Sequence, residues 1–180
     1  QSVYETGAPL PDPELFGLGV PVLGVCYGMQ AMARQLGGHV EPGTRREYGR
    51  AEVEVVEPGT MFAGLGRRET VWMSHGDQVA AAPPGFLVTA RSANAEVVGF
   101  ESRERGLYAI QFHAEVSHTL RGPEILHNFL CRGCGARGDW TMASYLTEAT
   151  GAIAERVGGD RVLWLHVRCR GCARSARSLR

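Results

Sequence analysis

Residues 20–30 read Val-Pro-Val-Leu-Gly-Val-Cys-Tyr-Gly-Met-Gln, and this stretch decides the fold that we expect. A short apolar run bounded by glycine and proline indicates a strand that is buried on both faces, as in a parallel sheet. Apolar residues then recur with helical spacing over 29–36, and the pair Gly37-Gly38 follows as a stop signal. The stretch therefore predicts a buried strand, a tight turn at Cys26 and a helix.

Cys26 has the setting of a reactive residue. Gly24 and Gly28 lie two residues to either side, as in the Gly-x-nucleophile-x-Gly elbow, where small neighbours let a strand and a helix crowd together around a strained turn. The dipole and free amide groups of a helix N-terminus also favour a thiolate. A buried structural cysteine is the alternative interpretation, and the two symmetric glycines favour the nucleophile.

The rest of the chain alternates between strand and helix signals. Residues 1–19 are rich in proline and predict loops with a short helical turn. Apolar runs separated by turn residues predict strands at 51–55, 70–73, 86–90, 96–101 and 107–112. Helical spacing predicts helices at 124–130 and 142–157. Together these elements predict an α/β fold with a mostly parallel sheet flanked by helices.

Length and charge narrow the class of protein. A chain of 180 residues suits one domain with a sizeable core, or a domain and a tail. The formal net charge is zero, so nothing favours nucleic acid or an anionic membrane as a partner. No apolar run approaches the roughly 18 residues that span a bilayer, and the polar opening residues lack a signal pattern. We therefore expect a cytoplasmic protein.

Four of the five cysteines form two Cys-Arg-Gly-Cys pairs, Cys131 with Cys134 and Cys169 with Cys172. Two such pairs can hold structural zinc. Their separation is longer than is usual for a zinc ribbon, and a predicted helix lies between them. We predict no metal site, and zinc bound by the two pairs remains an open alternative.

A second candidate group follows the strand predicted at 107–112. In an extended chain, residues two apart face the same side, so the Glu115 carboxylate can reach the ring of His113. A cysteine nucleophile needs such a base to take and return protons, and the base needs a carboxylate to orient it. A solvated glutamate beside a core histidine is the alternative, which the elbow at Cys26 disfavours.

Several motifs together resemble the class I glutamine amidotransferase domain of the GMP synthase family and the start of its linker. They are Val-Cys-Tyr-Gly-Met-Gln at 25–30, Met-Ser-His-Gly-Asp at 73–77, Gln-Phe-His-Ala-Glu-Val at 111–116 and Gly-Asp-Trp-Thr-Met at 138–142. The motifs occur in the family's order, and the resemblance covers roughly residues 1–163. It implies a flavodoxin-like α/β fold.

The resemblance also implies roles for particular residues. Cys26 is expected to attack the side-chain amide of glutamine and form a glutamyl thioester, with His113 as general acid and base and Glu115 as the residue that orients it. The expected substrate-binding residues are the backbone amide of Tyr27, which would stabilise the oxyanion, then Gln30, and a loop that closes over glutamine, formed by Ser74, His75, Gly76 and Asp77.

For the whole enzyme, the resemblance implies a ligase of purine biosynthesis that aminates XMP to GMP with ATP and magnesium. We expect residues 1–135 to be an amidotransferase domain truncated at its N-terminus, 136–163 a linker and helix leading to a synthetase domain, and 164–180 an aberrant basic tail. No cofactor is expected in this chain. Glutamine is the expected substrate, the synthetase domain normally lies on the same chain, and the complete enzyme is expected to be a homodimer.

The sequence departs from the family's pattern in places. Ala114 stands where the family has proline, which would restrict His113 to extended conformations. The loop that supplies a second oxyanion donor would lie upstream of residue 1, and the family's ATP-binding loop does not follow residue 163. The alternatives are therefore an amidotransferase subunit of another synthase, a catalytically impaired fragment, or a zinc-binding module.

Overall fold

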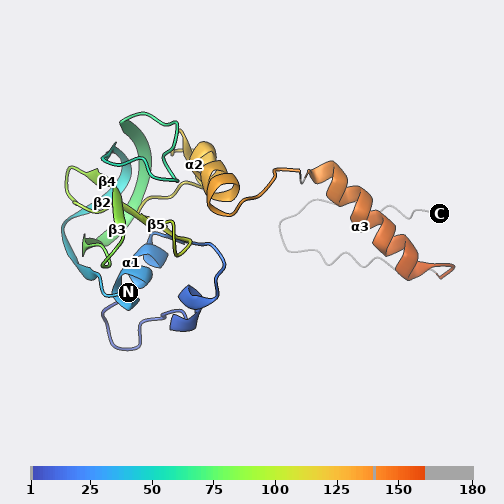
Figure 1. Cartoon of the computed structure of the whole chain (residues 1–180), viewed down its shortest axis with the longest axis horizontal. Helices are drawn as coiled ribbons and strands as arrows, with labels where there is room; N and C mark the ends of the chain where they lie inside the picture. Colours follow the sequence, from blue (N-terminus) through green and yellow to red (C-terminus); the bar gives the residue numbers. More distant parts are fainter. Residues whose placement is uncertain (1, 140, 161–180) are drawn as a thin grey trace, which may run out of the picture. The chain divides into compact units, whose positions relative to one another are not determined.

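The strand, turn and helix expected at residues 20–36 are present. The computed structural model describes residues 2–139 and 141–160. In it, a short 3₁₀ turn (Pro13–Gly17) precedes β1 (Val22–Val25), which leads through Cys26 into α1 (Tyr27–Gln35). These elements stand in blue at the start of the chain in Figure 1. The strand is only partly buried, because β1 lies at the edge of the described sheet, and it leads directly to Cys26 at the beginning of a helix.

The remaining strands form one sheet with β1. They are β2 (His39–Val55), β3 (Arg68–Ala81), β4 (Leu87–Ser92), β5 (Gly99–Ser102) and β6 (Leu107–Ile110). The strand order is β1-β6-β5-β4-β2-β3. The strands expected at 86–90, 96–101 and 107–112 correspond to β4, β5 and β6, whereas β2 and β3 extend well beyond the segments 51–55 and 70–73.

The α/β class is confirmed, but the sheet is mixed rather than mostly parallel. Among the described strands, β1 and β6 pair in parallel, and the other pairs are antiparallel. The physical reason lies in the connections. A parallel pair needs a crossover of about a dozen residues or more, whereas short turns join antiparallel neighbours. Residues 103–106 form a short turn that joins β5 to its antiparallel neighbour β6, and residues 93–98 likewise join the antiparallel pair β4 and β5.

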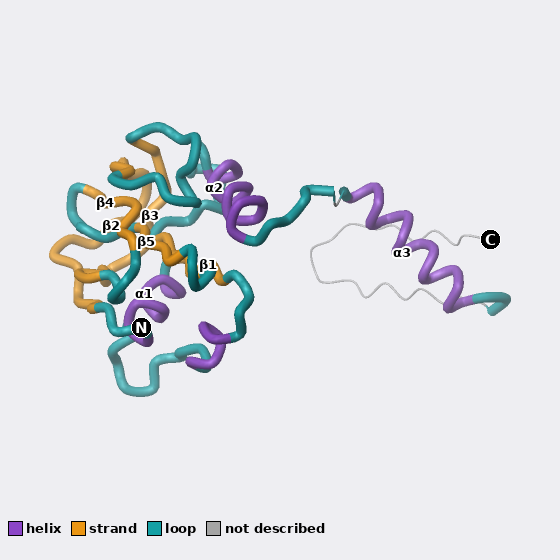
Figure 2. Tube along the Cα trace, viewed as in Figure 1, coloured by secondary structure: helices purple, strands orange, loops and turns teal. Residues whose placement is uncertain are grey.

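Helices cover both faces of this sheet (Figure 2). Along β6, Leu107 and Ala109 join the apolar cluster that contains α1 residues, while Tyr108 and Ile110 join the cluster that contains Ile125 of α2 (Gly122–Asn128). This alternation is the two-residue period of a strand that is buried on both sides. The β6 strand, which pairs with the edge strand β1, is therefore buried on both faces, and the residues that follow it are placed firmly.

The C-terminal part of the chain is a separate unit. The chain divides into residues 1–137 and a second unit that starts at Gly138. A short π-helical segment (Phe129–Gly133) continues α2, and α3 (Met142–Val157) belongs to the second unit. Thr141 and Ser144 cap α3 reciprocally. The helix expected at 142–157 is thus confirmed, whereas the tail at 164–180 lies outside the described residues.

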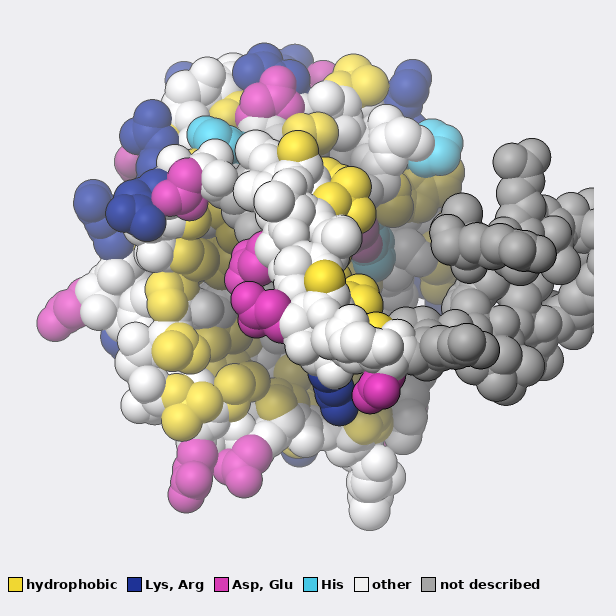
Figure 3. Space-filling model, turned by 90° about the vertical axis from the view of Figure 1, so that its right-hand side faces the viewer, with side chains coloured by type: hydrophobic (Ala, Val, Ile, Leu, Met, Phe, Trp, Pro, Cys, Tyr) yellow, Lys and Arg dark blue, Asp and Glu magenta, His cyan; other side chains and the backbone are white. Residues whose placement is uncertain are grey.

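The described surface carries mixed charge. On the face drawn in Figure 3, acidic and basic side chains are interspersed among apolar and uncharged ones, in keeping with the formal net charge of zero. Within residues 2–139 and 141–160, no helix is both long and apolar enough to cross a bilayer.

Candidate active site

Cys26 occupies a strained turn between β1 and α1. Its φ and ψ are 53° and −107°, and it is the one non-glycine residue of the described chain with a positive φ. Such a backbone persists only where its surroundings enforce it, and it is frequent at reactive positions. Here the Cys26 N–H donates to the Ile110 carbonyl at 2.9 Å, and the Cys26 carbonyl accepts from the Gln30 N–H at 3.2 Å. The elbow predicted from the sequence is present.

The two glycines that flank this turn are not equivalent. A Cβ atom at Gly24 would lie 2.8 Å from the carbonyl carbon and oxygen of Gly28, so no side chain fits at Gly24. A Cβ atom at Gly28 would have no other atom within 4 Å. The close approach of strand and helix therefore requires a glycine at position 24, and the crowding expected at position 28 is absent.

The Cys26 thiol lies among polar groups of other strands. Its Sγ donates to the Ser74 carbonyl at 3.6 Å and accepts from Gln111 Nε2 at 3.7 Å. Burial raises the pKa of this thiol above its usual value, the Tyr27 backbone N–H and Gln111 oppose the rise, and the Glu115 charge adds to it. The Tyr27 N–H at the start of the helix thus favours the thiolate as expected, but desolvation outweighs this effect.

His113 and Glu115 form the expected pair just after β6. The His113 Nδ1 atom lies 2.7 Å from Glu115 Oε1. Burial tends to raise the pKa of Glu115, but the hydrogen bond with His113, the Glu115 backbone N–H and the charge of His113 together outweigh it, so the pKa of this carboxyl lies below its usual value. The glutamate is therefore ionised and fixes the orientation of the imidazole.

The backbone of His113 is held without the help of a proline. Its N–H donates to the Trp72 carbonyl at 3.0 Å, and its carbonyl accepts from Thr119 Oγ1 at 2.5 Å. The Thr119 hydroxyl also accepts from the Trp72 N–H at 3.0 Å. These bonds tie the turn after β6 to β3, so Ala114 does not leave the backbone of His113 untethered.

A cleft of about 650 Å³ opens beside Cys26. Its lining includes all of the expected substrate-binding residues: Tyr27, Gln30, Ser74, His75, Gly76 and Asp77. Arg46 and Tyr48 of β2 and Tyr4 of the N-terminal segment also line it, whereas His113 and Glu115 do not. The structure thus gathers the nucleophile candidate and the binding candidates around one cavity, with the His113–Glu115 pair outside its lining.

Residues 74–77 are not the loop that the sequence suggested. They lie within β3 and pair with β2, with Ser74 opposite Tyr48 and Asp77 opposite Pro42. A register shift between Pro42 and Glu47 interrupts the ladder at this level. The segment therefore forms one wall of the cleft as part of a long hairpin, whose extent depends on pairing with residues about thirty positions away.

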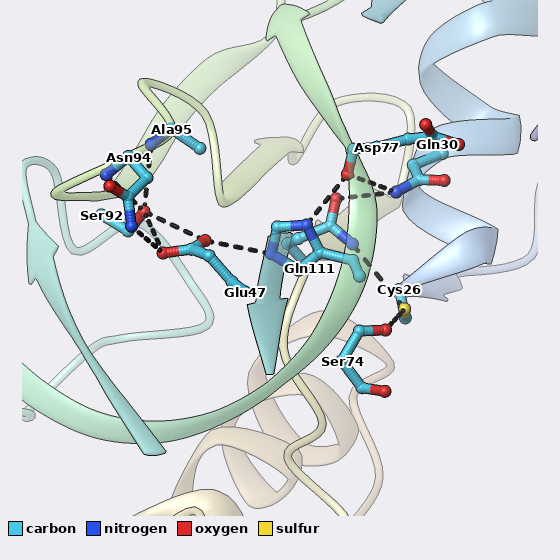
Figure 4. Close-up of polar contacts among 10 residues, drawn as sticks. Cys26, Gln30, Glu47, Ser74, Asp77, Ser92, Asn94, Ala95 and Gln111 are labelled. Carbon is cyan, nitrogen blue, oxygen red and sulfur yellow. Dashed lines mark hydrogen bonds and ion pairs between the residues drawn. The ribbon is translucent and has the colours of Figure 1, made fainter. Parts of the chain in front are cut away.

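Buried amides connect this wall to the thiol, as Figure 4 shows. Gln30 Nε2 donates to the Asp77 carbonyl at 3.0 Å and to Gln111 Oε1 at 3.2 Å. Gln111 in turn donates to Cys26 Sγ. The side-chain NH₂ group of Gln30 is thus occupied within the protein, and Gln111 is a site residue that the sequence analysis missed.

The N-terminal segment adds another residue to the site that the sequence did not indicate. The Tyr4 hydroxyl donates to Asp77 Oδ1 at 2.9 Å. The Tyr27 hydroxyl donates to the Pro9 carbonyl at 3.0 Å, which ties the start of α1 to the same segment. No periodicity or spacing distinguishes Tyr4, and the only sequence signal is its place in a loop-rich segment before the elbow.

The cysteine pairs form no zinc site in the part of the chain that the structure describes. Within residues 2–139 and 141–160 there is no group of three or more His, Cys, Asp or Glu side chains that could hold a metal ion. Cys131 Sγ lies 3.7 Å from His127 Nδ1, and Cys134 is exposed. Cys169 and Cys172 lie outside the described residues, so zinc bound by both pairs stays untested.

Comparisons with known proteins agree with this geometry. The chain matches the family described as "Glutamine amidotransferase class-I" over residues 1–132. The chain belongs to this family. It is 52% identical over 162 residues to "GMP synthase [glutamine-hydrolyzing]" of Carboxydothermus hydrogenoformans and 48% identical to the protein of that name in Syntrophomonas wolfei. Each match covers 90% of this chain and 32% of the relative, so the chain spans about a third of the length of these curated relatives.

Solved structures of this amidotransferase family share the fold. A protein from Thermoplasma acidophilum, described as a candidate GMP synthase component, superposes with a TM-score of 0.64 at 34% identity, over 76% of this chain and 64% of that one. A glutamine amidotransferase from Thermotoga maritima superposes with a TM-score of 0.54 at 26% identity, over 80% of this chain and 60% of that one.

Proposed function

We propose that this chain hydrolyses glutamine to glutamate and ammonia through a thioester on Cys26. The observation that carries the proposal is the strained turn at Cys26, which opens beside a cleft lined by the Ser74–Asp77 segment in a chain of the class-I amidotransferase family. The thiolate attacks the side-chain carbonyl carbon of glutamine, the carbon–nitrogen bond breaks, and ammonia leaves with an added proton. Water then cleaves the thioester, which releases glutamate and the free thiol.

His113 is proposed to move the protons in both steps. A thiol whose pKa is raised by burial is mostly protonated at neutral pH, so it needs a base to become a nucleophile. His113 would accept the thiol proton, donate it to the leaving ammonia, and then deprotonate the attacking water. The ionised Glu115 at 2.7 Å would orient the ring and stabilise its charged form.

The cleft is proposed to hold glutamine by charge and by backbone donors. The Tyr27 N–H, at the start of α1, would stabilise the oxyanion that forms on the substrate carbonyl. The Asp77 carboxylate offers a partner for the α-ammonium group of an amino acid. Gln30 would act by fixing Asp77 and Gln111 rather than through a free amide.

We further propose that the ammonia serves the amination of XMP to GMP. The support is that about half of the aligned residues are identical to those of proteins named "GMP synthase [glutamine-hydrolyzing]". In such an enzyme, a synthetase domain would use ATP and magnesium, and the glutamine chemistry at Cys26 uses neither. A homodimer, a cytoplasmic location and the absence of a nucleic-acid partner remain predictions.

Release of glutamate from glutamine tests the proposal. The unaltered chain should release glutamate in a coupled assay, and Cys26→Ala should reduce the rate by at least about 10⁴-fold, since the covalent route is lost. Cys134→Ala, which removes an exposed thiol outside the cleft, is the matched control and should retain full activity. Full activity in Cys26→Ala would overturn the proposal.

A further inference from the structure

A buried carboxylate–imidazole pair lies at the wall of the cleft. Glu47 of β2 and His75 of β3 are opposite one another in the antiparallel ladder. Glu47 Oε2 lies 3.1 Å from His75 Nε2, and their side chains are only 8% and 4% exposed. A buried charge is costly unless it is paired and its remaining lone pairs are satisfied. The pair therefore needs an explanation.

Further donors hold the Glu47 carboxylate from its other side. Ser92 Oγ lies 3.2 Å from Oε1 and 3.3 Å from Oε2, and Asn94 Nδ2 donates to Oε1 at 2.9 Å (Figure 4). The hydrogen bond with His75 lowers the pKa of Glu47 most, burial opposes this effect, and Asn94 and Ser92 lower it further. Glu47 is therefore ionised and fixed in place.

The second nitrogen of His75 faces the active site. His75 Nδ1 lies 2.9 Å from the Asp77 carbonyl oxygen, which also accepts the hydrogen bond from Gln30. The ring thus lies between the Glu47 carboxylate, 3.1 Å from Nε2, and the Asp77 carbonyl, 2.9 Å from Nδ1, both of which are acceptors. Contacts run without a break from Glu47 through His75 to the backbone of Asp77.

Glu47 cannot itself touch a molecule in the cleft. His75 and Asp77 line the cleft, whereas Glu47 lines an outer groove together with Ser92 and Asn94. Stability alone does not account for the pair, because replacing a buried ion pair by apolar residues is often neutral or stabilising. The contacts instead lead to a substrate-facing segment.

We propose that Glu47 is a positioning residue, which acts through His75 to hold the Asp77 segment in the geometry that binds glutamine. The inference rests on the proposed function, since it concerns glutamine binding at that site. Loss of the Glu47 charge removes a contact that holds the His75 ring, and the Asp77 backbone that the ring contacts is then less firmly held. The expected defect is therefore in substrate affinity, while the reactivity of Cys26 is retained.

Glu47→Gln tests this role because it removes the charge and keeps the size of the side chain. The probe is a diazoketone analogue of glutamine that alkylates the thiol of such sites and does not require turnover. The concentration for half-maximal inactivation should rise about tenfold, which corresponds to loss of one coupled contact. The maximal inactivation rate, and the rate of alkylation of Cys26 by iodoacetamide, should each change by less than about twofold.

Glu54→Gln is the matched control. Glu54 lies on the same strand and lines the same outer groove, but its partners are Arg67 and Arg91. This variant should behave as the unaltered chain. If Glu47→Gln fails to fold by circular dichroism, Asn94→Ala takes its place, since it removes one donor to Glu47 from an exposed position. It should raise the half-maximal concentration by roughly two- to threefold.

A double substitution shows whether Glu47 acts through the ring. In a His75→Asn background, Glu47→Gln should add no further loss of affinity, because the connection is already broken. Additive effects would overturn the proposed path, and an unchanged half-maximal concentration in Glu47→Gln would overturn the positioning role while leaving the glutamine function intact. If the unaltered chain reacts with iodoacetamide at Cys26 but shows no saturation with the diazoketone, the proposed function and this inference both fall.

Discussion

At the scale of single residues, the Cys26 thiol depends on Gln111. A hydrogen bond to a charged form favours that form, and the Gln111 side chain donates to Sγ. Replacement by an apolar side chain of similar size, Gln111→Met, removes this donor. The thiol pKa, already raised by burial, should then rise further, and less thiolate should be present at any given pH.

The pH dependence of alkylation by iodoacetamide, resolved by peptide mass mapping, measures this shift. The midpoint for Cys26 should move to higher pH in Gln111→Met. Cys134 provides an internal control, since burial alone raises its pKa and no contact joins it to Gln111 in the described chain. A midpoint for Cys26 that stays in place or moves to lower pH would contradict the role given to Gln111.

Ala114 offers a second test at this scale. Its neighbour His113 is already held at both its N–H and its carbonyl, and the buried Ala114 borders a small cavity with Pro123 and Leu126. A proline at this position should therefore fit and restrict the unfolded chain, which would stabilise the protein by about 0.4–1 kcal/mol. Urea unfolding measures the change. A lower free energy of unfolding would show that the turn has adapted to alanine.

At the scale of elements, the packing of β1 against α1 leads us to expect that alanine has opposite effects on stability at Gly24 and Gly28. Gly24→Ala would push a methyl group into the Gly28 carbonyl and should destabilise the protein by about 1–3 kcal/mol. Gly28 lies in α1 with open space around it, so Gly28→Ala should stabilise the helix by about 0.5–1 kcal/mol. Urea unfolding of both variants tests the account, and equal losses at the two positions would refute it.

The same elements show what the sequence could and could not predict. The elbow and the His113–Glu115 pair were predictable because each depends on residues a few positions apart. The long hairpin of β2 and β3 was not, because the polar residues between 41 and 50 become a strand only by pairing with 72–78. The placement of residues 74–77 in a strand depends on this tertiary pairing, and the contact of Gln111 with Cys26 depends on the pairing of β1 with β6. Neither pairing leaves a local pattern in the sequence.

At the scale of the whole molecule, the order and direction of the strands determine where the candidate active site lies. The neighbouring strands β1 and β6 are parallel, so the residues that follow them meet at one end of the sheet, and these residues include Cys26 and Gln111. The hairpin of β2 and β3 then brings the 74–77 segment to the same end. One site therefore depends on the order of strands in the whole sheet, which the family resemblance implied and local patterns did not.

The most direct measurement of the central claim is the mass of the chain during incubation with glutamine. After an acid quench, the peptide that contains Cys26 should carry a glutamyl group, and the adduct should disappear once glutamine is consumed. Cys26→Ala should show no adduct, while Gln111→Met should form it more slowly, because less thiolate is present. Glutamate release without any adduct on Cys26, or an adduct on another cysteine, would contradict the account.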